Sequence, residues 1–400
     1  MATHIQALPA HRMTGPSIAC DTLANTPVWD DGAWDGLPRL DRDVEADVCV
    51  VGLGGSGLSC IAELRGLGAS VAGIDAGMVA GGAAGRNGGF LLAGAARFYH
   101  AAVAEYGRER ARAIYHLTLA EIDRIAAETP GAVRRTGSLR IAASPAEVDD
   151  CRLQLAAMRA DGLAVEWYEG AEGEGLLVPT DAAFDPLLRC RLLARRELAA
   201  GARLFEHSPA VELSADGVRT PAGRVRCGKV IVAVDGGLDR VVPALARRVR
   251  TARLQMVATA PLPEVRFPRP VYLRYGYEWW QQLPDGRIAL GGFRDQGGDS
   301  EWTHDAEPCD TVQGLIGAFL RDTLGIDAPI THRWAASVGY TADGLPVLAE
   351  VEPGMWACGG YSGHGNAIGA ICGRAAAQLA LTGASELAAP FIATDEVTRE

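Results

Sequence analysis

A short apolar segment that runs straight into a glycine-rich loop is the feature that most restricts how this chain can fold. Residues 47–51 (Asp-Val-Cys-Val-Val) predict a buried parallel strand, and the loop Gly52-Leu-Gly-Gly-Ser-Gly57 follows it directly. A helical pattern continues to Gly68, and residues 69–75 predict the next strand. Because such a strand–helix–strand unit is parallel and right-handed by default, the chain is expected to build an α/β fold around it.

The spacing of the loop glycines is typical of a dinucleotide-binding turn. The first glycine permits a tight turn, the second lets the backbone approach a pyrophosphate, and the third lets the helix pack close to the strand. The helix N-terminus then offers free N–H groups to phosphate, and an acidic residue after the next strand suits a ribose hydroxyl. A purely structural glycine turn is the alternative. The predicted nucleotide contacts of this unit are Gly52, Gly54, Gly55, Ser56, Gly57, Asp75 and Ala76.

Two further glycine-rich segments indicate a large planar ligand. Glycine lets the backbone lie flat against such a ligand, and Arg86 and Asn87 add donors for phosphate or ring carbonyl groups. A mobile loop is the alternative for this first segment. The second segment runs directly into the last predicted helix, whose N-terminus carries positive potential. The predicted contacts are Gly85, Arg86, Asn87, Gly88 and Gly89 in the first segment, and Gly360, Gly363, His364, Gly365 and Asn366 in the second.

The chain resembles the D-amino-acid oxidase superfamily of FAD-dependent oxidoreductases, which includes glycine oxidase, monomeric sarcosine oxidase and the γ-glutamylputrescine oxidases. The motifs that carry the resemblance occur in the family's order: the glycine loop with Asp75, AAGRNGG at 83–89, VIVAVDGG at 230–237 and GGYSGHG at 359–365. The resemblance covers about residues 44–383 and is closest to the γ-glutamylputrescine oxidase branch. It implies FAD as the cofactor, with Val211 and Gly236 among its contacts.

The chain departs from the family at two places. In sarcosine oxidases a cysteine just before the C-terminal loop tethers the flavin, but the corresponding stretch 337–341 contains no cysteine, so the FAD is expected to be held non-covalently. In the family a lysine or arginine just after the Gly-His pair often holds the substrate carboxylate. Here Gly365, Asn366 and Ala367 follow His364 instead, which argues against a simple α-amino acid held in that manner.

The resemblance also implies two domains that interleave along the chain, namely an α/β, Rossmann-like FAD-binding domain and a mixed-sheet α+β substrate domain. Residues 1–44 lack periodicity and are predicted to be an N-terminal extension draped over the fold. The FAD-binding domain is assigned residues 45–95, 180–250 and 331–400, and the substrate domain residues 96–179 and 251–330. Helical periodicity predicts helices over about 101–128, 145–162, 186–201, 307–324 and 366–382, and a Pro-Asp-Gly turn at 284–286 predicts a hairpin.

An aromatic stretch from 272 to 280 (YLRYGYEWW) is the predicted wall of the substrate site. It holds five aromatic residues in nine, within a chain that is only 6% aromatic. An ordinary strand with aromatic residues on both faces is the alternative. The functional interpretation is an aromatic pocket for an amine, with Arg274 or Glu278 selecting the charge of its tail, and strand alternation places Arg274 and Trp280 on the same face. The predicted catalytic residues are Tyr272, Arg274, Trp280 and His364, although His364 could equally be a satisfied loop histidine.

Composition restricts the partners and the location. The chain has 49 acidic and 38 basic residues, a net charge of −11 that argues against nucleic acid or an anionic membrane as a partner. No run of about 18 apolar residues could span a bilayer, and the first residues lack the apolar stretch of a signal peptide, so a cytoplasmic location is expected. The nine cysteines lack metal-ligand spacing and predict reduced thiols and no metal site, with Cys49 and Cys60 serving packing.

Together these observations predict an FAD-dependent oxidase of an amine or amino acid. A substrate C–H beside a neutral nitrogen hands hydride to the flavin, the imine hydrolyses, and molecular oxygen reoxidises the flavin to give hydrogen peroxide. A flavin dehydrogenase that passes electrons to a carrier, and a non-catalytic FAD-binding subunit, are the alternatives. Lys229 is the only lysine and is expected at a solvated strand edge. Positive charge for the oxygen reaction would then come from His364, an arginine or the last helix.

Overall fold

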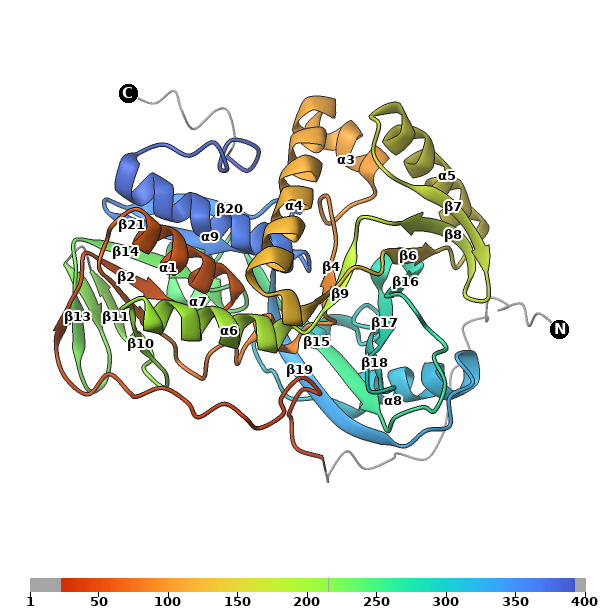
Figure 1. The fold of residues 1–400 in the computed structure, drawn as a ribbon, viewed down its shortest axis with the longest axis horizontal. Coiled ribbons are helices and arrows are strands. Elements are labelled where there is room, and N and C mark those ends of the chain that lie inside the picture. Colours follow the sequence, from red (N-terminus) through yellow and green to blue (C-terminus); the bar gives the residue numbers. More distant parts are fainter. Residues whose placement is uncertain (1–22, 215, 393–400) are drawn as a thin grey trace.

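Two large β-sheets, one of six strands and one of eight, form the framework of the protein (Figure 1). This computed structural model describes residues 23–214 and 216–392. The six-stranded sheet lies in the left half of Figure 1 and the eight-stranded sheet in the right half, with helices packed on both. The predicted α/β fold is therefore confirmed.

The six-stranded sheet contains the predicted strand–helix–strand unit. β2 (Val48–Val51) leads into α1 (Gly55–Gly66) and β3 (Val71–Ile74), and the two strands pair in parallel. All residues of both strands are buried, as expected for a parallel sheet covered on both faces. The strand order is β10-β3-β2-β14-β21-β20, with β10 at Arg203–Phe205, β14 at Lys229–Ala233, β21 at Met355–Gly359 and β20 at Val347–Glu352.

Helices cover one face of this sheet and a second, smaller sheet covers the other. Val48 and Val50 share a core with residues of the helices α1, α6 (Pro186–Ala199) and α9 (Gly365–Thr382). Cys49 and Val51 point to the opposite face, where they pack on a four-stranded sheet. That sheet has the order β1-β13-β12-β11, with bounds Val44–Glu45, Arg224–Arg226, Gly217–Arg219 and Glu212–Ser214. Cys49 and Cys60 are fully buried, in agreement with their predicted packing role.

The eight-stranded sheet is mixed: β16 and β6 pair in parallel, and all other neighbouring strands of the sheet pair antiparallel. Its order is β19-β15-β18-β17-β16-β6-β8-β7, with bounds Ile330–Tyr340, Arg250–Thr259, Ile288–Gly292, Glu278–Gln282, Val271–Leu273, Ser138–Ile141, Gly173–Val178 and Glu166–Gly170. The helix α8 (Asp310–Ala318) packs on β15 and β18, and α5 (Pro145–Ala160) packs on β8. The predicted hairpin is the β17–β18 pair.

Short elements connect the two halves. A three-stranded sheet has the order β4-β9-β5, with bounds Phe90–Leu91, Ala182–Phe184 and Val133–Arg134. Two one-turn helices, α2 (Ala83–Arg86) and α7 (Leu238–Val241), follow β3 and β14. Single 3₁₀ turns occupy Pro130–Ala132, Pro243–Leu245, Arg274–Gly276 and Gly298–Glu301.

Two predicted helices are interrupted. The helix expected over 101–128 is two helices, α3 (Tyr99–Tyr106) and α4 (Arg108–Glu128), because Gly107 between them has φ +83°. The helix expected over 307–324 is α8 followed by a π-helical turn at Phe319–Thr323. The helices predicted near 145–162, 186–201 and 366–382 are α5, α6 and α9.

The structure bears on two of the predicted segments, the boundary near residue 331 and the N-terminal extension. β19 begins at Ile330 and pairs with β15 along its length, so residues 330–340 belong to the eight-stranded sheet. This differs from the expectation, which assigned 331–400 to the domain that contains the six-stranded sheet. Of the predicted extension, residues 1–22 lie outside the described residues. Trp29 in the described part is buried, and its indole N–H donates to the Asn87 carbonyl at 3.0 Å.

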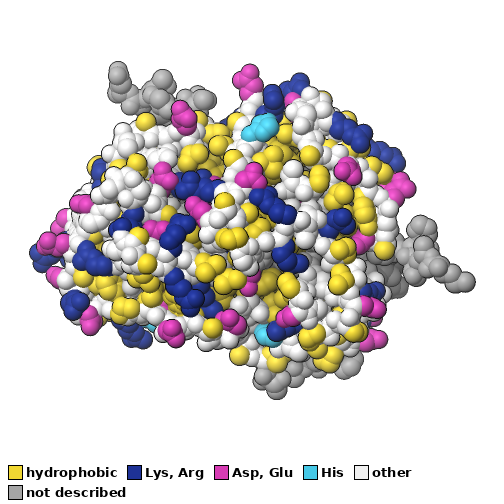
Figure 2. Space-filling view, in the orientation of Figure 1, with side chains coloured by type: hydrophobic (Ala, Val, Ile, Leu, Met, Phe, Trp, Pro, Cys, Tyr) yellow, Lys and Arg dark blue, Asp and Glu magenta, His cyan; other side chains and the backbone are white. Residues whose placement is uncertain are grey.

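In residues 23–214 and 216–392 no helix combines the length and the apolar character needed to cross a membrane. Acidic and basic side chains are interspersed over the face of the molecule that Figure 2 shows.

Candidate active site

The glycine loop between β2 and α1 has a geometry that depends on missing side chains. Gly52 has φ +105°, and a Cβ on Gly57 would lie 1.8 Å from the Gly52 carbonyl oxygen. The bare backbone at Gly57 therefore lets α1 begin directly over the end of β2. The loop and the first turn of α1 form one wall of a cavity of about 730 Å³, which we call the nucleotide cavity.

Most residues predicted to contact a nucleotide line this cavity. They belong to segments far apart in the sequence, and several directly follow β2, β3 or β14, so the motifs meet at the carboxyl ends of parallel strands. The predicted residues that line the nucleotide cavity are Gly52, Gly54, Gly55, Ser56, Asp75, Ala76, Arg86, Asn87, Gly236, Gly363, Gly365 and Asn366.

Other predicted contact residues lie behind the wall. A Cβ at Gly85 would lie 2.4 Å from the Ala80 carbonyl oxygen, and one at Gly89 would lie 2.4 Å from that of Phe184, so both are packing glycines. Gly57 and Gly360 are likewise not wall residues, whereas Gly88 and His364 line the neighbouring cavity described below.

Val211 is a correction to the predicted contacts. It is 50% exposed, lines neither cavity, and donates its backbone N–H to Arg219 across the four-stranded sheet. The neighbouring Ala210 lines the nucleotide cavity, so the prediction was displaced by one residue.

Asp75 lies at the end of β3, and its carboxylate fixes the glycine loop. Oδ2 accepts from the Leu53 N–H at 2.7 Å, and Oδ1 accepts from the Gly77 N–H at 2.8 Å. Burial raises the pKa of Asp75 although these two backbone hydrogen bonds oppose the shift. Because each carboxylate oxygen can accept more than one hydrogen bond, Asp75 retains acceptor capacity toward a ribose hydroxyl.

Arg86 and Asn87 organise the wall between the two sheets. Arg86 Nη1 donates to Asn25 Oδ1 at 2.7 Å and to the Ala335 carbonyl at 2.9 Å, so its donors hold the chain rather than a phosphate. Asn87 and Asn366 face each other with side-chain distances of 3.1 Å. Asn25 also lines the nucleotide cavity, and nothing in the aperiodic N-terminal sequence marked it as a site residue.

Arg189 on α6 is a second wall residue that the sequence analysis missed. Its side chain is buried, with the residue 3% exposed, and a Cβ on Gly55 would lie 2.9 Å from Arg189 Nη1. Its Nη2 donates to Ser59 Oγ at 3.3 Å, and its Nε has no hydrogen-bond partner among the described residues. Arg191, by contrast, pairs with Asp30 at 2.9 Å. Because a buried guanidinium requires a counter-ion, Arg189 fits the diphosphate of a dinucleotide.

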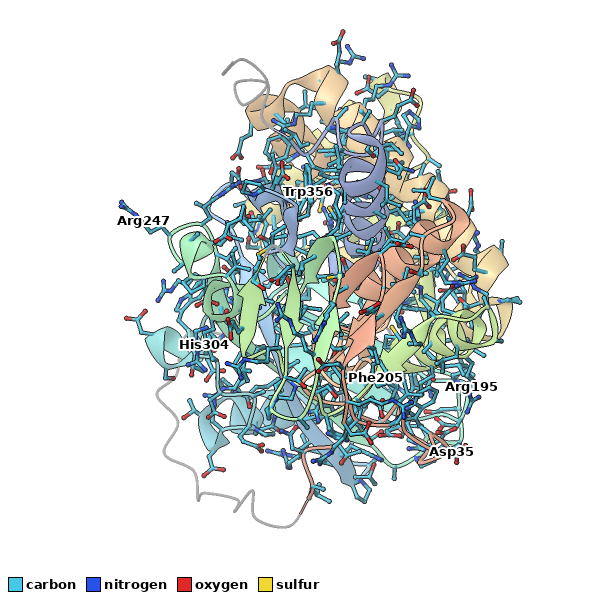
Figure 3. All side chains as sticks on the ribbon, turned by 90° about the vertical axis from the view of Figure 1, so that its left-hand side faces the viewer. Asp35, Arg195, Phe205, Arg247, His304 and Trp356 are labelled. Carbon is cyan, nitrogen blue, oxygen red and sulfur yellow. The ribbon has the colours of Figure 1, made fainter. Side chains whose placement is uncertain are left out.

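His304 approaches the nucleotide cavity from the segment before α8. Figure 3 labels it, and its Nε2 lies 2.8 Å from Asp239 Oδ2 on α7. On the same side of the cavity, Asp235 accepts from the Tyr361 N–H at 3.0 Å and the Gly339 N–H at 3.2 Å. Burial raises the pKa of Asp235 to about 6. Asp235 thus ties β19 and the C-terminal glycine segment to the end of β14.

A second cavity, of about 350 Å³, adjoins the nucleotide cavity, and we call it the aromatic cavity. Asn87, Leu254, Val338, Gly363 and Asn366 are among the residues that line both cavities. Its volume is within the range of small-molecule sites. Its aromatic wall consists of Phe90, Phe98, Tyr272, Tyr275, Tyr277, Trp279 and Tyr340.

Trp279, and not the predicted Trp280, lines this cavity. Tyr272 on β16 is directly opposite Trp279 on β17, so the two side chains share a sheet face. Trp280 is 1% exposed and packs edge-to-face on Phe267 in the core on the other face. The prediction failed because residues 272–280 are not one strand but two, joined by a tight turn that resets the alternation.

Arg274 also departs from its predicted role. It lies in that turn with φ +51°, its Nε donates to Glu278 at 2.8 Å, and its Nη1 donates to Asp295 at 2.7 Å. It does not line the aromatic cavity. Two carboxylates therefore neutralise Arg274, and it fixes the β16–β17 turn instead of binding a substrate.

His364 lies at the N-terminus of α9 and lines the aromatic cavity, as does the predicted Tyr272. Burial, with a smaller contribution from the charge of Arg140, lowers the pKa of His364 to about 4. The imidazole is therefore neutral at neutral pH and cannot supply the positive charge expected of it. Its Nδ1 has no hydrogen-bond partner among the described residues. Lys229 begins β14 and lines neither cavity.

The chain is similar to known proteins over most of its length. A family model described as FAD dependent oxidoreductase matches residues 47–379. The chain is 28% identical over 376 residues to gamma-glutamylputrescine oxidoreductase of Escherichia coli, covering 85% of this chain and 84% of that protein. It is also 28% identical over 387 residues to the probable oxidoreductase OrdL of Rhizobium meliloti, covering 88% and 86% of the two chains.

Solved structures with the same fold include two enzymes. Glycine oxidase from Geobacillus kaustophilus is similar with a TM-score of 0.70 at 18% identity, over 87% of this chain and 98% of that chain. L-proline dehydrogenase from P. horikoshii is similar with a TM-score of 0.69 at 19% identity, over 88% and 96%. These likenesses concern the fold.

Proposed function

The chain belongs to the family of FAD-dependent oxidoreductases, whose model matches residues 47–379, as its motifs predicted. From this premise we propose that it oxidises an amine or amino acid and uses molecular oxygen as the electron acceptor. The observation that carries the proposal is the aromatic cavity, which shares a wall with the nucleotide cavity. A substrate held in one cavity can then lie against a cofactor ring held in the other, as hydride transfer requires. The gamma-glutamylputrescine oxidoreductase relative supports a nitrogen-bearing substrate.

The residues of the nucleotide cavity fit FAD. The glycine loop, the N-terminus of α1 and Arg189, which forms no ion pair among the described residues, would hold the diphosphate, and Asp75 would hold a ribose. Gly363 and Asn366, which line both cavities, would border the flavin. The stretch 337–341, which corresponds to the tethering position of sarcosine oxidases, contains no cysteine, and this supports non-covalent binding.

The chain's own groups bind and orient the substrate. The aromatic wall shields the reacting C–H bond from water, and the neutral imidazole of His364, which lines the cavity, can accept a hydrogen bond from the substrate nitrogen. The N-terminus of α9 adds positive potential where the cavities meet. In this way the site would favour the neutral amine, which is the form that can give up hydride.

FAD, when bound, would supply the two-electron redox chemistry of the reaction. Overall the substrate loses two electrons and two protons as its C–N single bond becomes an imine. Oxygen gains two electrons and two protons as hydrogen peroxide. Water then adds to the imine and releases a carbonyl compound and the free amine.

Anaerobic mixing of the purified holoprotein with a panel of amines and amino acids tests this proposal. We expect at least one compound to bleach the flavin absorbance, and admission of oxygen to restore it with one hydrogen peroxide per turnover. A flavin that no compound in the panel bleaches would contradict the proposal.

A dehydrogenase that hands its electrons to a carrier is the second candidate. One observation bears on it: His364 is neutral and Lys229 lines neither cavity, so only an arginine or the N-terminus of α9 could supply a positive charge that assists reduction of oxygen. Bleaching by a substrate, followed by reoxidation with an artificial acceptor but not with oxygen, would identify this candidate.

A further inference from the structure

Four arginines line the aromatic cavity, whereas none of the described residues that line it is an aspartate or a glutamate. Two of the four already have partners within the protein. Arg97 pairs with Glu105 at 3.0 Å, and Arg86 donates hydrogen bonds to Asn25 and to backbone carbonyls. Arg140 and Arg294 remain. This surplus of positive charge is local, since the chain as a whole carries a net charge of −11.

Arg140, on β6, is held by neutral groups. Its Nη1 donates to Gln154 Oε1 at 2.7 Å, and its Cζ lies 4.4 Å from the centre of the Phe98 ring. The charge of Arg140 lowers the pKa of Glu147 and Asp181, but both carboxylates accept hydrogen bonds from other donors. Neither forms an ion pair with Arg140, and no other carboxylate among the described residues does so. Its guanidinium is thus oriented, yet it lacks a counter-ion.

Arg294 follows β18 and is held in a similar way. Its Cζ lies 4.7 Å from the Trp302 ring, 5.0 Å from the Tyr340 ring and 5.9 Å from the Tyr277 ring. Its neighbour Asp295 is taken by Arg274, at 2.7 and 2.9 Å. No carboxylate among the described residues forms an ion pair with Arg294. Aromatic faces and a hydrogen bond to Tyr340 therefore position the Arg294 guanidinium, which has no anionic partner among the described residues.

Two fixed and uncompensated guanidinium groups make a small cavity selective for anions. Each one matches a carboxylate through two parallel hydrogen bonds, and partial burial strengthens that pairing. Like charge repels, so a cationic chain in the same place meets both groups unfavourably. Neither arginine lies at the family's position after the Gly-His pair, where Asn366 and Ala367 stand.

We propose that the aromatic cavity selects substrates with two carboxylates, one held by Arg140 and the other by Arg294. The substrate class is then a dicarboxylic amino acid or a secondary amine that carries two carboxylates, and diamines are excluded. That such a molecule is oxidised rests on the function proposed above. The charge selection itself is a property of the cavity and can be measured without turnover.

Three ligands of equal length and different charge test the selection. Glutarate, pentanoate and 1,5-diaminopentane have five carbons each and carry two negative charges, one negative charge and two positive charges. Their binding to the holoprotein is measured by calorimetry and by the change in flavin absorbance. We expect glutarate to bind about tenfold to a hundredfold more tightly than pentanoate, since one further charged contact is gained, and the diamine not to bind.

Substitutions at the two arginines assign the contacts. Arg140→Met and Arg294→Met keep the apolar stem, and each should reduce the affinity for glutarate to that for pentanoate. Arg140→Lys and Arg294→Lys keep the charge and should retain part of the affinity. Arg287→Met is the matched control, because Arg287 pairs with Asp285 at 2.8 Å and lines neither cavity. Its affinity for glutarate should equal that of the wild type.

Equal binding of glutarate and pentanoate by the wild type would overturn the proposal, as would tighter binding of the diamine or unchanged glutarate affinity in both Met variants. If a Met variant fails to fold, the three-ligand comparison on the wild type still decides. Failure of the proposed oxidation is a separate result. In that case no dicarboxylic amine bleaches the flavin, although glutarate still binds with the expected preference.

Discussion

At the scale of single residues, arginine carries most of the fixed positive charge of this protein. Lys229 is the only lysine, so a guanidinium group or a helix N-terminus must act wherever the site needs a cation. Arg189 is the clearest case, because it is almost fully buried at the glycine loop and its Nε is unpartnered among the described residues. Burying such a group is costly without an anion, so we expect the Arg189 guanidinium to gain an anionic partner when a dinucleotide binds.

We therefore expect Arg189→Met to weaken FAD binding about tenfold to a hundredfold, because one charge-assisted contact to the diphosphate is lost. Titration of apoprotein with FAD, followed by the quenching of flavin fluorescence, measures the dissociation constant. Arg195→Met on the same helix is the control, since Arg195 is exposed and stacks on Trp34 with 5.4 Å from Cζ to the ring centre. Riboflavin lacks the diphosphate and should bind the Arg189 variant and the wild type equally. An unchanged dissociation constant for FAD in Arg189→Met would remove the diphosphate role.

At the scale of elements, the cofactor wall depends on how closely two helices approach. α9 crosses α1 at Gly373, where a Cβ would lie 2.1 Å from the Ser56 carbonyl oxygen in the first turn of α1. Cys372 and Ala376 on α9 pack in the same core as Leu58 and Ile61 on α1. The start of α9 borders both cavities, so a shift between the helices displaces the glycine loop and the C-terminal segment together.

Gly373→Ala should consequently destabilise the protein by about 1–3 kcal/mol, the usual cost of overpacking, and should lower its FAD content. Gly314→Ala on α8 is the matched control, because no atom lies within 4 Å of a Cβ at that exposed position. It should stabilise the protein by about 0.4–1 kcal/mol through the entropy of the unfolded chain. Urea denaturation and the ratio of flavin to protein absorbance measure both effects. Equal stability of the two variants would mean that α9 can shift without cost.

The elements also show where prediction from sequence succeeds and where it stops. β2, α1 and β3 follow from local signals, since a buried apolar run, a glycine turn and a helical period specify them without reference to the rest of the chain. The stretch 272–280 has only Gly276 as a signal for its turn, because Arg274 and Tyr275 adopt positive φ without being glycine. Counting alternation across that turn selected Trp280 in place of Trp279.

At the scale of the whole molecule, the site is assembled from contacts that no local pattern contains. The glycine motifs were recognisable because their chemistry requires glycine at fixed spacing. Asn25, Arg189, Arg140 and Arg294 have ordinary sequence surroundings, and they become site residues only because the sheets bring distant segments to the same two cavities. The glycine motifs were thus predictable from the sequence, whereas the arginine and asparagine side chains that complete both cavities were not.

The stability of the whole fold depends on pH partly through Asp181. It precedes β9, is buried, and accepts from Ser138 Oγ at 2.6 Å and the Ala93 N–H at 3.0 Å, so it joins β6 to the segment that follows β4. Burial raises the pKa of Asp181 from 3.8 to about 6, against the opposing effect of these hydrogen bonds. The native state therefore holds this proton more tightly than the unfolded state does.

The sign of the pH effect follows from that difference in proton binding. Between about pH 4 and pH 6 the native state binds more protons at Asp181, so its contribution to the free energy of unfolding falls as the pH rises through this window and is constant above it. Relative to Asp181→Asn, which cannot titrate, the wild type should lose up to about 3 kcal/mol between these limits. Urea denaturation of both proteins at several pH values measures the difference.

Asp47→Asn is the control with the opposite sign, because hydrogen bonds from Ser70 lower the pKa of Asp47. The contribution of Asp47 to the free energy of unfolding therefore grows as the pH rises toward 4. A difference between wild type and Asp181→Asn that does not change from pH 4 to pH 7 would show that the Asp181 carboxyl titrates alike in the native and unfolded states.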